Sequence, residues 1–171
     1  DGELFVGTNY RMSELEASVD IVQLRKLSGV VERHRRVRKH VVERLKGYRE
    51  IVPQRVNDVE GQVGYLLRSY PETVELGEKI VAALKAEGVS CSMRGTKAGP
   101  DWHQYSDMFP ITLGAPMAAN GLPQTDPRYI ERGGKVRYHR GDCPVADDLY
   151  NRNVMVHLNQ WYSDEDCESV A

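Results

Sequence analysis

The longest regular hydrophobic pattern in the chain covers residues 13–48. Its apolar residues recur mostly at intervals of three or four, which places them on one side of a helix. Gly29 interrupts this pattern, and glycine inside a helix costs about 1 kcal/mol relative to alanine. We therefore expect a long helix over 13–48 that is bent or divided near 28–29 and stops near Gly47. The apolar stripe consists of Leu15, Val19, Val22, Leu27, Val30, Val31, Val37, Val41 and Leu45.

The remainder of the chain alternates short strand patterns with helix patterns. Strands are expected at 62–70, 89–93 and 154–158, and helices at 73–87, at 144–151 and from 163 onward. Such an order predicts an α+β fold: a small sheet with helices packed on it, reached through the long helix. The segment 95–141 is rich in glycine and proline and shows little periodicity, and a loop of that length is usually functional or mobile.

A strong helix start follows a short polar loop near the beginning of the sequence. Ser13 and Glu16 have the spacing of a capping box, in which each side chain binds a backbone N–H group of the other residue. The loop in front of it presents the amide of Asn9, the phenol of Tyr10 and the guanidinium of Arg11. Free N–H groups and the helix dipole favour negative charge at such a position. The sequence therefore predicts an anion site here.

Composition narrows the class of protein. The chain has 171 residues, 40% hydrophobic content and a net charge of −2, which is typical of one globular domain. It shows neither an apolar run of the roughly 20 residues that cross a bilayer nor a signal peptide, so we expect a cytoplasmic protein. Its three cysteines (Cys91, Cys143 and Cys167) are widely spaced and predict reduced thiols without a metal site. The missing initiator Met and the short last helix suggest truncation at both ends.

Charge on the long helix supports an alternative function. Residues 25–49 contain ten lysines and arginines but only Glu32 and Glu43, a net excess of eight positive charges. A basic helix of this kind can bind phosphate backbones, although no helix-turn-helix or similar signature accompanies it. A nucleic-acid-binding module is thus one alternative, and a dimerisation module that uses the apolar stripe is another.

Several segments resemble one enzyme family. Residues 7–15 closely resemble the G-x-N-Y-R-M-S-E-L segment of the DegT/StrS family of pyridoxal-phosphate-dependent sugar aminotransferases. In this chain the segment reads Gly7-Thr8-Asn9-Tyr10-Arg11-Met12-Ser13-Glu14-Leu15. The resemblance continues through Leu27, is fair over 65–89, and returns at 143–149 and 161–166, which look like the closing segments of that family. Little of 95–141 resembles it.

This resemblance implies that the chain is the C-terminal portion of a fold-type I aminotransferase. Residues 1–12 would then be a loop from the large domain, 13–48 an interdomain helix, and 49–171 the small domain. The family works as a homodimer with shared active sites, so Asn9 would reach the cofactor phosphate in the neighbouring subunit's site, and Arg11 would order the loop or add positive charge. In the simpler alternative, Asn9 caps a turn and Arg11 pairs with a carboxylate.

The resemblance also implies a reaction. Members of the family transfer an amino group from glutamate or glutamine to a keto-sugar, often a nucleotide-linked one, while some relatives perform dehydration or regulation. The catalytic Schiff-base lysine of the family lies in the large domain, upstream of the matching segment, and no lysine of this chain corresponds to it. We therefore expect no catalytic residue here and no transamination by this chain alone.

Two residues of the long loop are candidates for binding the substrate. By resemblance, the region of Trp102 and His103 approaches the sugar nucleotide, and an aromatic ring beside an imidazole suits a sugar or a base. The alternative is that Trp102 anchors the loop to the core while His103 lies on the surface.

Overall fold

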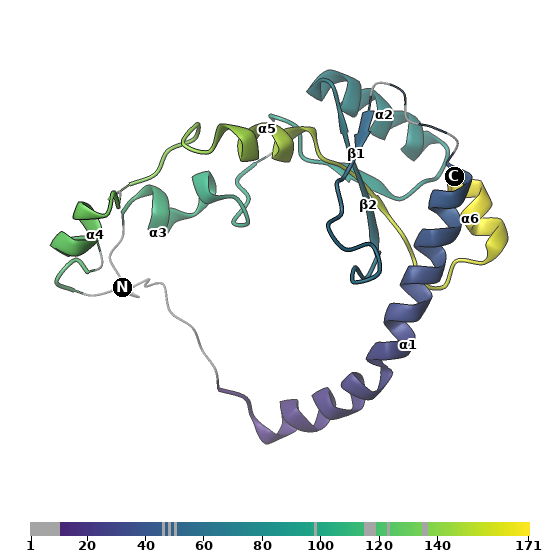
Figure 1. Ribbon diagram of the computed structural model, residues 1–171, viewed down its shortest axis with the longest axis horizontal. Helices are drawn as coiled ribbons and strands as arrows, with labels where there is room; N and C mark the ends of the chain where they lie inside the picture. The colour runs from purple at the N-terminus through teal and green to yellow at the C-terminus, as the bar shows by residue number, and fades with distance from the viewer. Residues whose placement is uncertain are drawn as a thin grey trace. The chain divides into compact units, whose positions relative to one another are not determined.

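The computed structural model describes residues 11–45, 47, 49, 51–97, 99–114, 119–122, 124–134 and 137–171. Its residues divide into two compact units, described separately here. The sheet unit comprises residues 12–97 and 148–171, and the loop unit comprises Arg11 and the described part of 98–147. Their elements, labelled in Figure 1, are α1 (Glu14–Arg44), β1 (Ile51–Pro53), β2 (Leu66–Pro71), α2 (Val74–Ala86), β3 (Cys91–Met93), η1 (Tyr105–Asp107), α3 (Phe109–Thr112), α4 (Pro127–Glu131), α5 (Pro144–Arg152), β4 (Val154–His157) and α6 (Asp164–Val170).

The sheet unit contains a four-stranded antiparallel sheet with the strand order β1-β2-β4-β3. In its centre, Leu67 of β2 pairs with Val156 of β4, and Ser69 pairs with Val154. Side chains alternate between the two faces of a strand, so these four residues share one face. The small antiparallel sheet with its helices confirms the predicted α+β class.

Two small hydrophobic clusters form on that face. In the first, Val37 and Val41 of α1 pack with Cys167 of α6, and in the second, Val81 of α2 packs with Val154. Val156 contacts both clusters, so α1 and α2 lie on the same side of the sheet. Only the C-terminal half of the apolar stripe on α1 therefore packs in the core. The apolar side chains of its N-terminal half, including Val19, are exposed.

Removing one of these core side chains gives a first test of the packing. Val41 is 1% exposed, and Val41→Ala removes two buried methyl groups, so we expect the free energy of unfolding to fall by about 2 kcal/mol. Val19→Ala, on the same face of the same helix but 52% exposed, is the matched control and should change it by less than about 0.5 kcal/mol. Urea unfolding followed by circular dichroism measures both; equal losses would contradict this packing.

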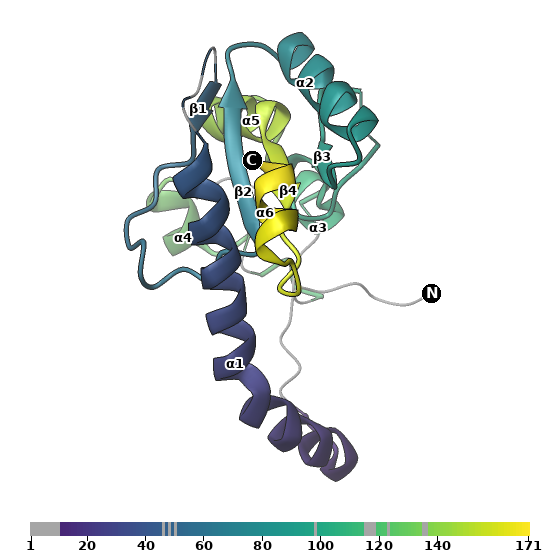
Figure 2. The same cartoon turned by 90° about the vertical axis from the view of Figure 1, so that its right-hand side faces the viewer.

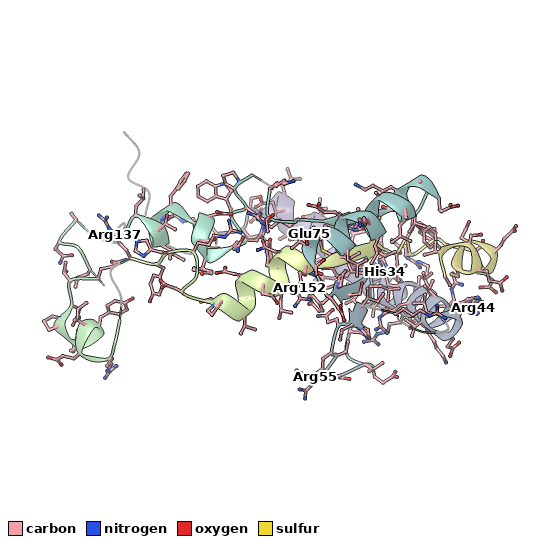
Figure 3. All side chains as sticks on the ribbon, turned by 90° about the horizontal axis from the view of Figure 1, so that it is seen from above. His34, Arg44, Arg55, Glu75, Arg137 and Arg152 are labelled. Carbon is pink, nitrogen blue, oxygen red and sulfur yellow. The ribbon has the colours of Figure 1, made fainter. Side chains whose placement is uncertain are left out.

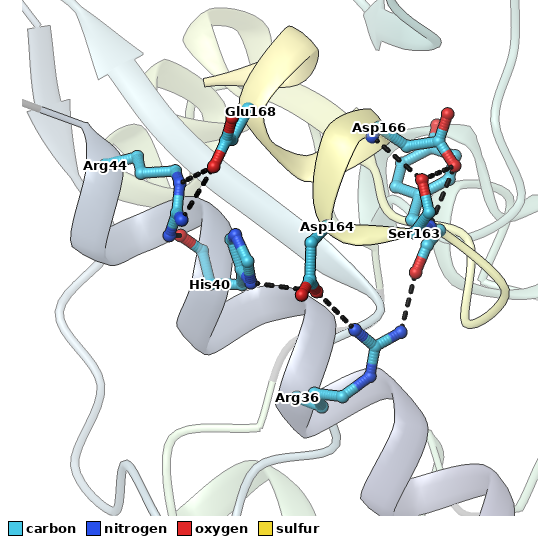
Figure 4. Close-up of polar contacts among 8 residues, drawn as sticks. Arg36, His40, Arg44, Ser163, Asp164, Asp166 and Glu168 are labelled. Carbon is cyan, nitrogen blue, oxygen red and sulfur yellow. Dashed lines mark hydrogen bonds and ion pairs between the residues drawn. The ribbon is translucent and has the colours of Figure 1, made fainter.

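Exposed polar contacts hold α6 along α1, and the two helices lie side by side in Figure 2. In Figure 4, Asp164 accepts from Arg36 Nη1 at 3.1 Å and lies 3.2 Å from His40 Nδ1, while Glu168 accepts from Arg44 Nη2 at 2.9 Å. Because these carboxylates are exposed, each pair contributes less than about 1 kcal/mol, and their main effect is to fix the orientation of α6.

The N-terminus of α6 has a capping box. Ser163 Oγ accepts a hydrogen bond from Asp166 N at 3.1 Å, and Asp166 Oδ2 accepts from Ser163 N at 2.8 Å (Figure 4). These hydrogen bonds from Ser163 hold the pKa of Asp166 below its ordinary value. A short helix, which is marginal by itself, therefore starts at a defined residue.

The observed elements differ from the predicted ones at the end of α1, at β1 and within 95–141. The helical pattern was expected to reach residue 48, but α1 ends at Arg44 because Leu45 turns to an extended backbone with ψ 109°. The helix continues unbroken past Gly29, and its axis changes direction in the N-terminal half (Figure 2). Strand β1 was not predicted. The described part of 95–141 contains three short helices, η1, α3 and α4, which are too brief to show periodicity.

Helix α5 ends in an ion pair that also contacts the sheet. Arg152, labelled in Figure 3, donates to the carboxylate of Asp148 one turn earlier and to the carbonyl of Pro71 at the end of β2. The hydrogen bonds and the charge of Arg152 lower the pKa of Asp148. This contact fixes the last turn of α5 against the strand that precedes α2.

Candidate functional site

The first turn of α1 contains the predicted capping box. Ser13 Oγ accepts from Glu16 N at 3.2 Å, and Glu16 Oε2 accepts from Ser13 N at 2.8 Å. The hydrogen bonds from the Ser13 backbone and side chain lower the pKa of Glu16, so its carboxylate is ionised at neutral pH. An acidic side chain therefore already occupies the helix start, and Glu14 adds a second one. These two carboxylates disfavour an external anion at the first turn itself, and the anion site expected in the loop before it stays a prediction.

A phosphate would have to be held by the residues that precede the cap. Arg11 is exposed there, and its guanidinium is a suitable donor to a phosphate oxygen. Asn9 and Tyr10 lie outside the described residues. The donor set of an amide and a guanidinium fits the phosphate of pyridoxal phosphate, whereas the first turn of α1, with its two carboxylates, does not.

The predicted substrate residue Trp102 lies in the loop unit and is 54% exposed. Its ring packs edge-on against Phe109, which is 48% exposed, with 4.5 Å between the ring centroids. Two neighbouring aromatic rings that face solvent form an apolar surface on which a sugar or base can stack. Sequence reasoning missed Phe109, because several aromatic residues occur in 95–141 and none of them stands out as the partner of Trp102.

His103, the second predicted substrate residue, is held by the carboxylate of Asp101. Asp101 Oδ1 lies 2.9 Å from His103 Nδ1 and accepts from His103 N at 2.9 Å. The imidazole itself is 90% exposed. A carboxylate on Nδ1 fixes the ring orientation and leaves Nε2 directed away from this contact. Trp102 and His103 are adjacent in sequence, but their side chains have different described partners, Phe109 and Asp101.

A buried polar cluster anchors this segment to the start of α5. The Asp147 carboxylate accepts from Gln104 Nε2 at 3.2 Å, from the Tyr105 hydroxyl at 2.9 Å and from Gly141 N at 2.8 Å. Tyr105 Oη also accepts from Cys143 N at 3.1 Å. We call Gln104, Tyr105, Gly141 and Asp147 the Asp147 cluster.

The cluster is built around a charged carboxylate. Burial by itself raises the pKa of Asp147, but the hydrogen bonds from Gly141, Tyr105 and Gln104 and the charge of Arg140 outweigh it, and the pKa lies below its ordinary value. Burial is also the largest cause that raises the pKa of Tyr105, together with its contact to Asp147. The tyrosine therefore stays a neutral donor and the aspartate an ionised acceptor.

Several basic side chains of α1 make contacts within the sheet unit. Arg36 and Arg44 pair with α6, Arg35 Nε donates to Gln62 O at 3.0 Å, and the Arg33 guanidinium stacks on the Trp161 ring at 4.3 Å. These four arginines contact residues of α6 and of the loops beside the sheet. Fewer basic side chains are therefore available to an external phosphate than the ten lysines and arginines of 25–49. The geometry thus gives nucleic-acid binding no specific support.

Comparison with known proteins decides the family. Residues 2–107, more than half of the chain, match the family model of the DegT/DnrJ/EryC1/StrS aminotransferase family. The chain belongs to this family. The match includes the Asn9–Arg11 loop and α1, and it ends within η1, so it confirms the resemblance seen in the N-terminal segments.

A solved structure shares the fold. A protein of Streptococcus pneumoniae named as a sugar aminotransferase, in its apo form, matches with a TM-score of 0.57 and 17% sequence identity. The match covers 93% of this chain but 33% of the other protein, so the chain spans about a third of the length of this relative. At this identity the likeness establishes a shared fold.

Within the part of the chain that the structure describes, no three or more His, Cys, Asp or Glu side chains come together as a metal ion would require. None of its helices combines the length and the apolar character needed to cross a bilayer.

Proposed function

We propose that this chain is the C-terminal portion of a pyridoxal-phosphate-dependent aminotransferase that acts on a keto-sugar, often a nucleotide-linked one. The match over residues 2–107 to the aminotransferase family carries this proposal. The proposed division follows the predicted one: residues 1–12 belong to the large domain, 13–48 form the interdomain helix, and 49–171 form the small domain. Glutamate or glutamine supplies the amino group, and the complete protein is a cytoplasmic homodimer.

Each candidate residue has a proposed role. Asn9 donates its amide N–H to the cofactor phosphate in the neighbouring subunit's site, and Arg11 adds positive charge beside it. Trp102, supported by Phe109, stacks on the substrate, while His103, oriented by Asp101 at Nδ1, accepts from a substrate hydroxyl through Nε2. The cofactor, when bound, supplies the electron sink for moving the amino group. These residues bind and orient; the lysine that holds the cofactor lies outside this chain.

The proposed function is tested on a protein that joins this chain to a lysine-bearing large domain of the family. With pyridoxal phosphate bound, addition of glutamate should remove the visible absorption band of the cofactor, and addition of a keto-sugar nucleotide should restore it. The 171-residue chain alone should show neither change. A cofactor band that persists with every amino donor tried would contradict aminotransferase activity.

The proposed stacking surface predicts a selective loss of substrate affinity. In the complete protein, Trp102→Ala should raise KM for the sugar substrate about tenfold, because stacking on one aromatic side chain contributes about 1–3 kcal/mol per base. The value of KM for the amino donor should stay within about twofold. Trp161→Ala, which removes a tryptophan that is 69% exposed in the other unit, is the matched control. An unchanged KM in Trp102→Ala would favour the anchoring role.

A further inference from the structure

The proposed substrate residues surround a buried point of the loop unit. Trp102 and Phe109 are 54% and 48% exposed, and the imidazole of His103 is 90% exposed. Between them along the chain, Gln104 is only 5% exposed and Tyr105 is half-buried. A segment whose polar anchor is buried and whose aromatic side chains reach solvent is held from within, so the anchor decides where those side chains lie.

The hydroxyl group of Tyr105 makes three hydrogen bonds. It donates to Asp147 Oδ2 at 2.9 Å, and its oxygen accepts from Gly141 N at 3.2 Å and from Cys143 N at 3.1 Å. A tyrosine hydroxyl has one hydrogen to donate, and here that hydrogen is used. The hydroxyl is therefore fixed to α5 and to the turn before it from three directions, and it has no donor left for a substrate.

The chain around Tyr105 is closed by short-range hydrogen bonds. Gln104 N donates to Asp101 O at 2.9 Å, Asp107 N donates to Gln104 O at 2.9 Å, and Asp101 N donates to Asp107 Oδ2 at 2.8 Å. Asp101 also binds the backbone N–H and the ring of His103, and α3 begins two residues after η1 ends. This segment is thus one hydrogen-bonded unit, and a shift at Tyr105 displaces the residues on both sides of it.

We infer that Tyr105 is a positioning residue for the substrate: its hydroxyl holds the surface formed by Trp102 and Phe109 in place before the substrate binds. The inference rests on the proposed stacking role of Trp102. Order in advance matters because conformational freedom that is lost on binding is subtracted from the affinity, and the apparent dissociation constant rises as the binding-competent fraction falls. In this role Tyr105 acts through Trp102 and makes no contact with the substrate itself.

Tyr105→Phe in the complete protein tests this role, because it removes the hydroxyl and keeps the ring. A hydrogen bond to a charged acceptor corresponds to roughly tenfold or more in an equilibrium constant, while the bonds from Gln104 and Gly141 to Asp147 remain. We therefore expect KM for the keto-sugar to rise about fivefold, with kcat and KM for the amino donor within about twofold of the wild type.

The matched control is Tyr129→Phe, which removes a hydroxyl from another half-buried tyrosine of the same unit and should leave all three constants unchanged. A double-variant cycle then shows whether Tyr105 acts through Trp102. The effect of Tyr105→Phe should shrink to about twofold or less when Trp102→Ala is already present, since the surface that it misplaces is then absent. An unchanged KM in Tyr105→Phe, or the same rise in both backgrounds, would overturn the inference while the effect of Trp102→Ala persists. If Trp102→Ala itself leaves KM unchanged, the proposed stacking role is wrong and the inference is wrong with it.

Fluorescence of the 171-residue chain tests the ordering of Trp102 without cofactor or substrate. Trp161→Phe leaves Trp102 as the only tryptophan, and in that background Tyr105→Phe should add a fast component of local motion to the decay of its fluorescence anisotropy. The matched control should decay like the parent protein. Gln104→Met, which removes the other side-chain donor of the Asp147 cluster, should act in the same direction and replaces Tyr105→Phe if that variant does not fold. An anisotropy decay that neither variant changes would overturn the positioning role, whatever the activity of the complete protein.

Discussion

Asp147→Ala is expected to free the 101–109 segment from the start of α5. The change leaves three donors, on Gln104, Tyr105 and Gly141, without their shared carboxylate in a region where Asp147 is only 9% exposed. Losing a buried, charge-assisted acceptor costs about 2 kcal/mol. Hydrogen exchange of the Gly141 amide should therefore accelerate about thirtyfold.

The adjacent aspartate provides the control for this experiment. Asp148 is exposed and pairs with Arg152, so Asp148→Ala removes the same type of side chain from the same helix without touching the Asp147 cluster. Exchange at Gly141 should stay within about twofold of the wild type in that variant. If both variants accelerated exchange equally, the cluster would not be what protects this amide.

The lowered pKa of Asp147 gives the cluster a defined pH dependence. Because the folded pKa lies below the ordinary value of 3.8, the ionised carboxylate stabilises the folded state fully above that value. The stabilisation is lost as the pH falls below 3.8 towards the folded pKa. Protection of the Gly141 amide, corrected for intrinsic exchange, should therefore be constant from pH 7 to pH 5 and decline below pH 4, and Asp147→Ala should remove this decline.

Asn9→Ala is the second variant with a large expected effect. In the complete protein it should weaken pyridoxal phosphate binding about tenfold to a hundredfold, since a hydrogen bond to a charged oxygen contributes about 1.5–3 kcal/mol. Equilibrium dialysis of the cofactor measures this. Asn57→Ala, an exposed asparagine in the turn after β1, is the matched control. Unchanged cofactor affinity in Asn9→Ala would assign Asn9 to capping a turn.

Mixed dimers test whether Asn9 acts across the subunit boundary. One subunit carries Asn9→Ala, and the other has an intact Asn9 but lacks the cofactor-binding lysine. If Asn9 serves the neighbouring site, the mixed dimer contains one complete site and regains up to half of the activity per dimer. If Asn9 serves its own subunit, both sites are defective and no activity returns.

Local sequence signals predicted local structure well in this chain. The Ser13–Glu16 capping box and the start of α2 after Thr73 occur as expected, because each depends on hydrogen bonds between residues close in sequence. The strands β3 and β4 lie within their predicted segments, and β2 overlaps the segment predicted for it but begins at Leu66 and includes Pro71. Strand β1 was missed, because Ile51–Pro53 is recognised as a strand only through its pairing with the distant residues Ser69–Pro71.

The candidate site was predicted only in part. Trp102 and His103 were proposed from resemblance, but their described partners, Phe109 and Asp101, emerged from the structure. Asp147 was missed altogether, because in the sequence it is one of two neighbouring acidic residues on a short helix. Its neighbour Asp148 is exposed, and only the folded path of the loop shows which of the two receives buried donors.

The sequence by itself determined the family and the α+β class, since these depend on motifs and periods of a few residues. Tertiary structure alone decided which half of the α1 stripe is buried, as Val41 is covered by the sheet and α6 while Val19 is not. It also decided the partners of Asp147. Both depend on contacts between residues distant in sequence, for which a one-dimensional pattern carries no signal.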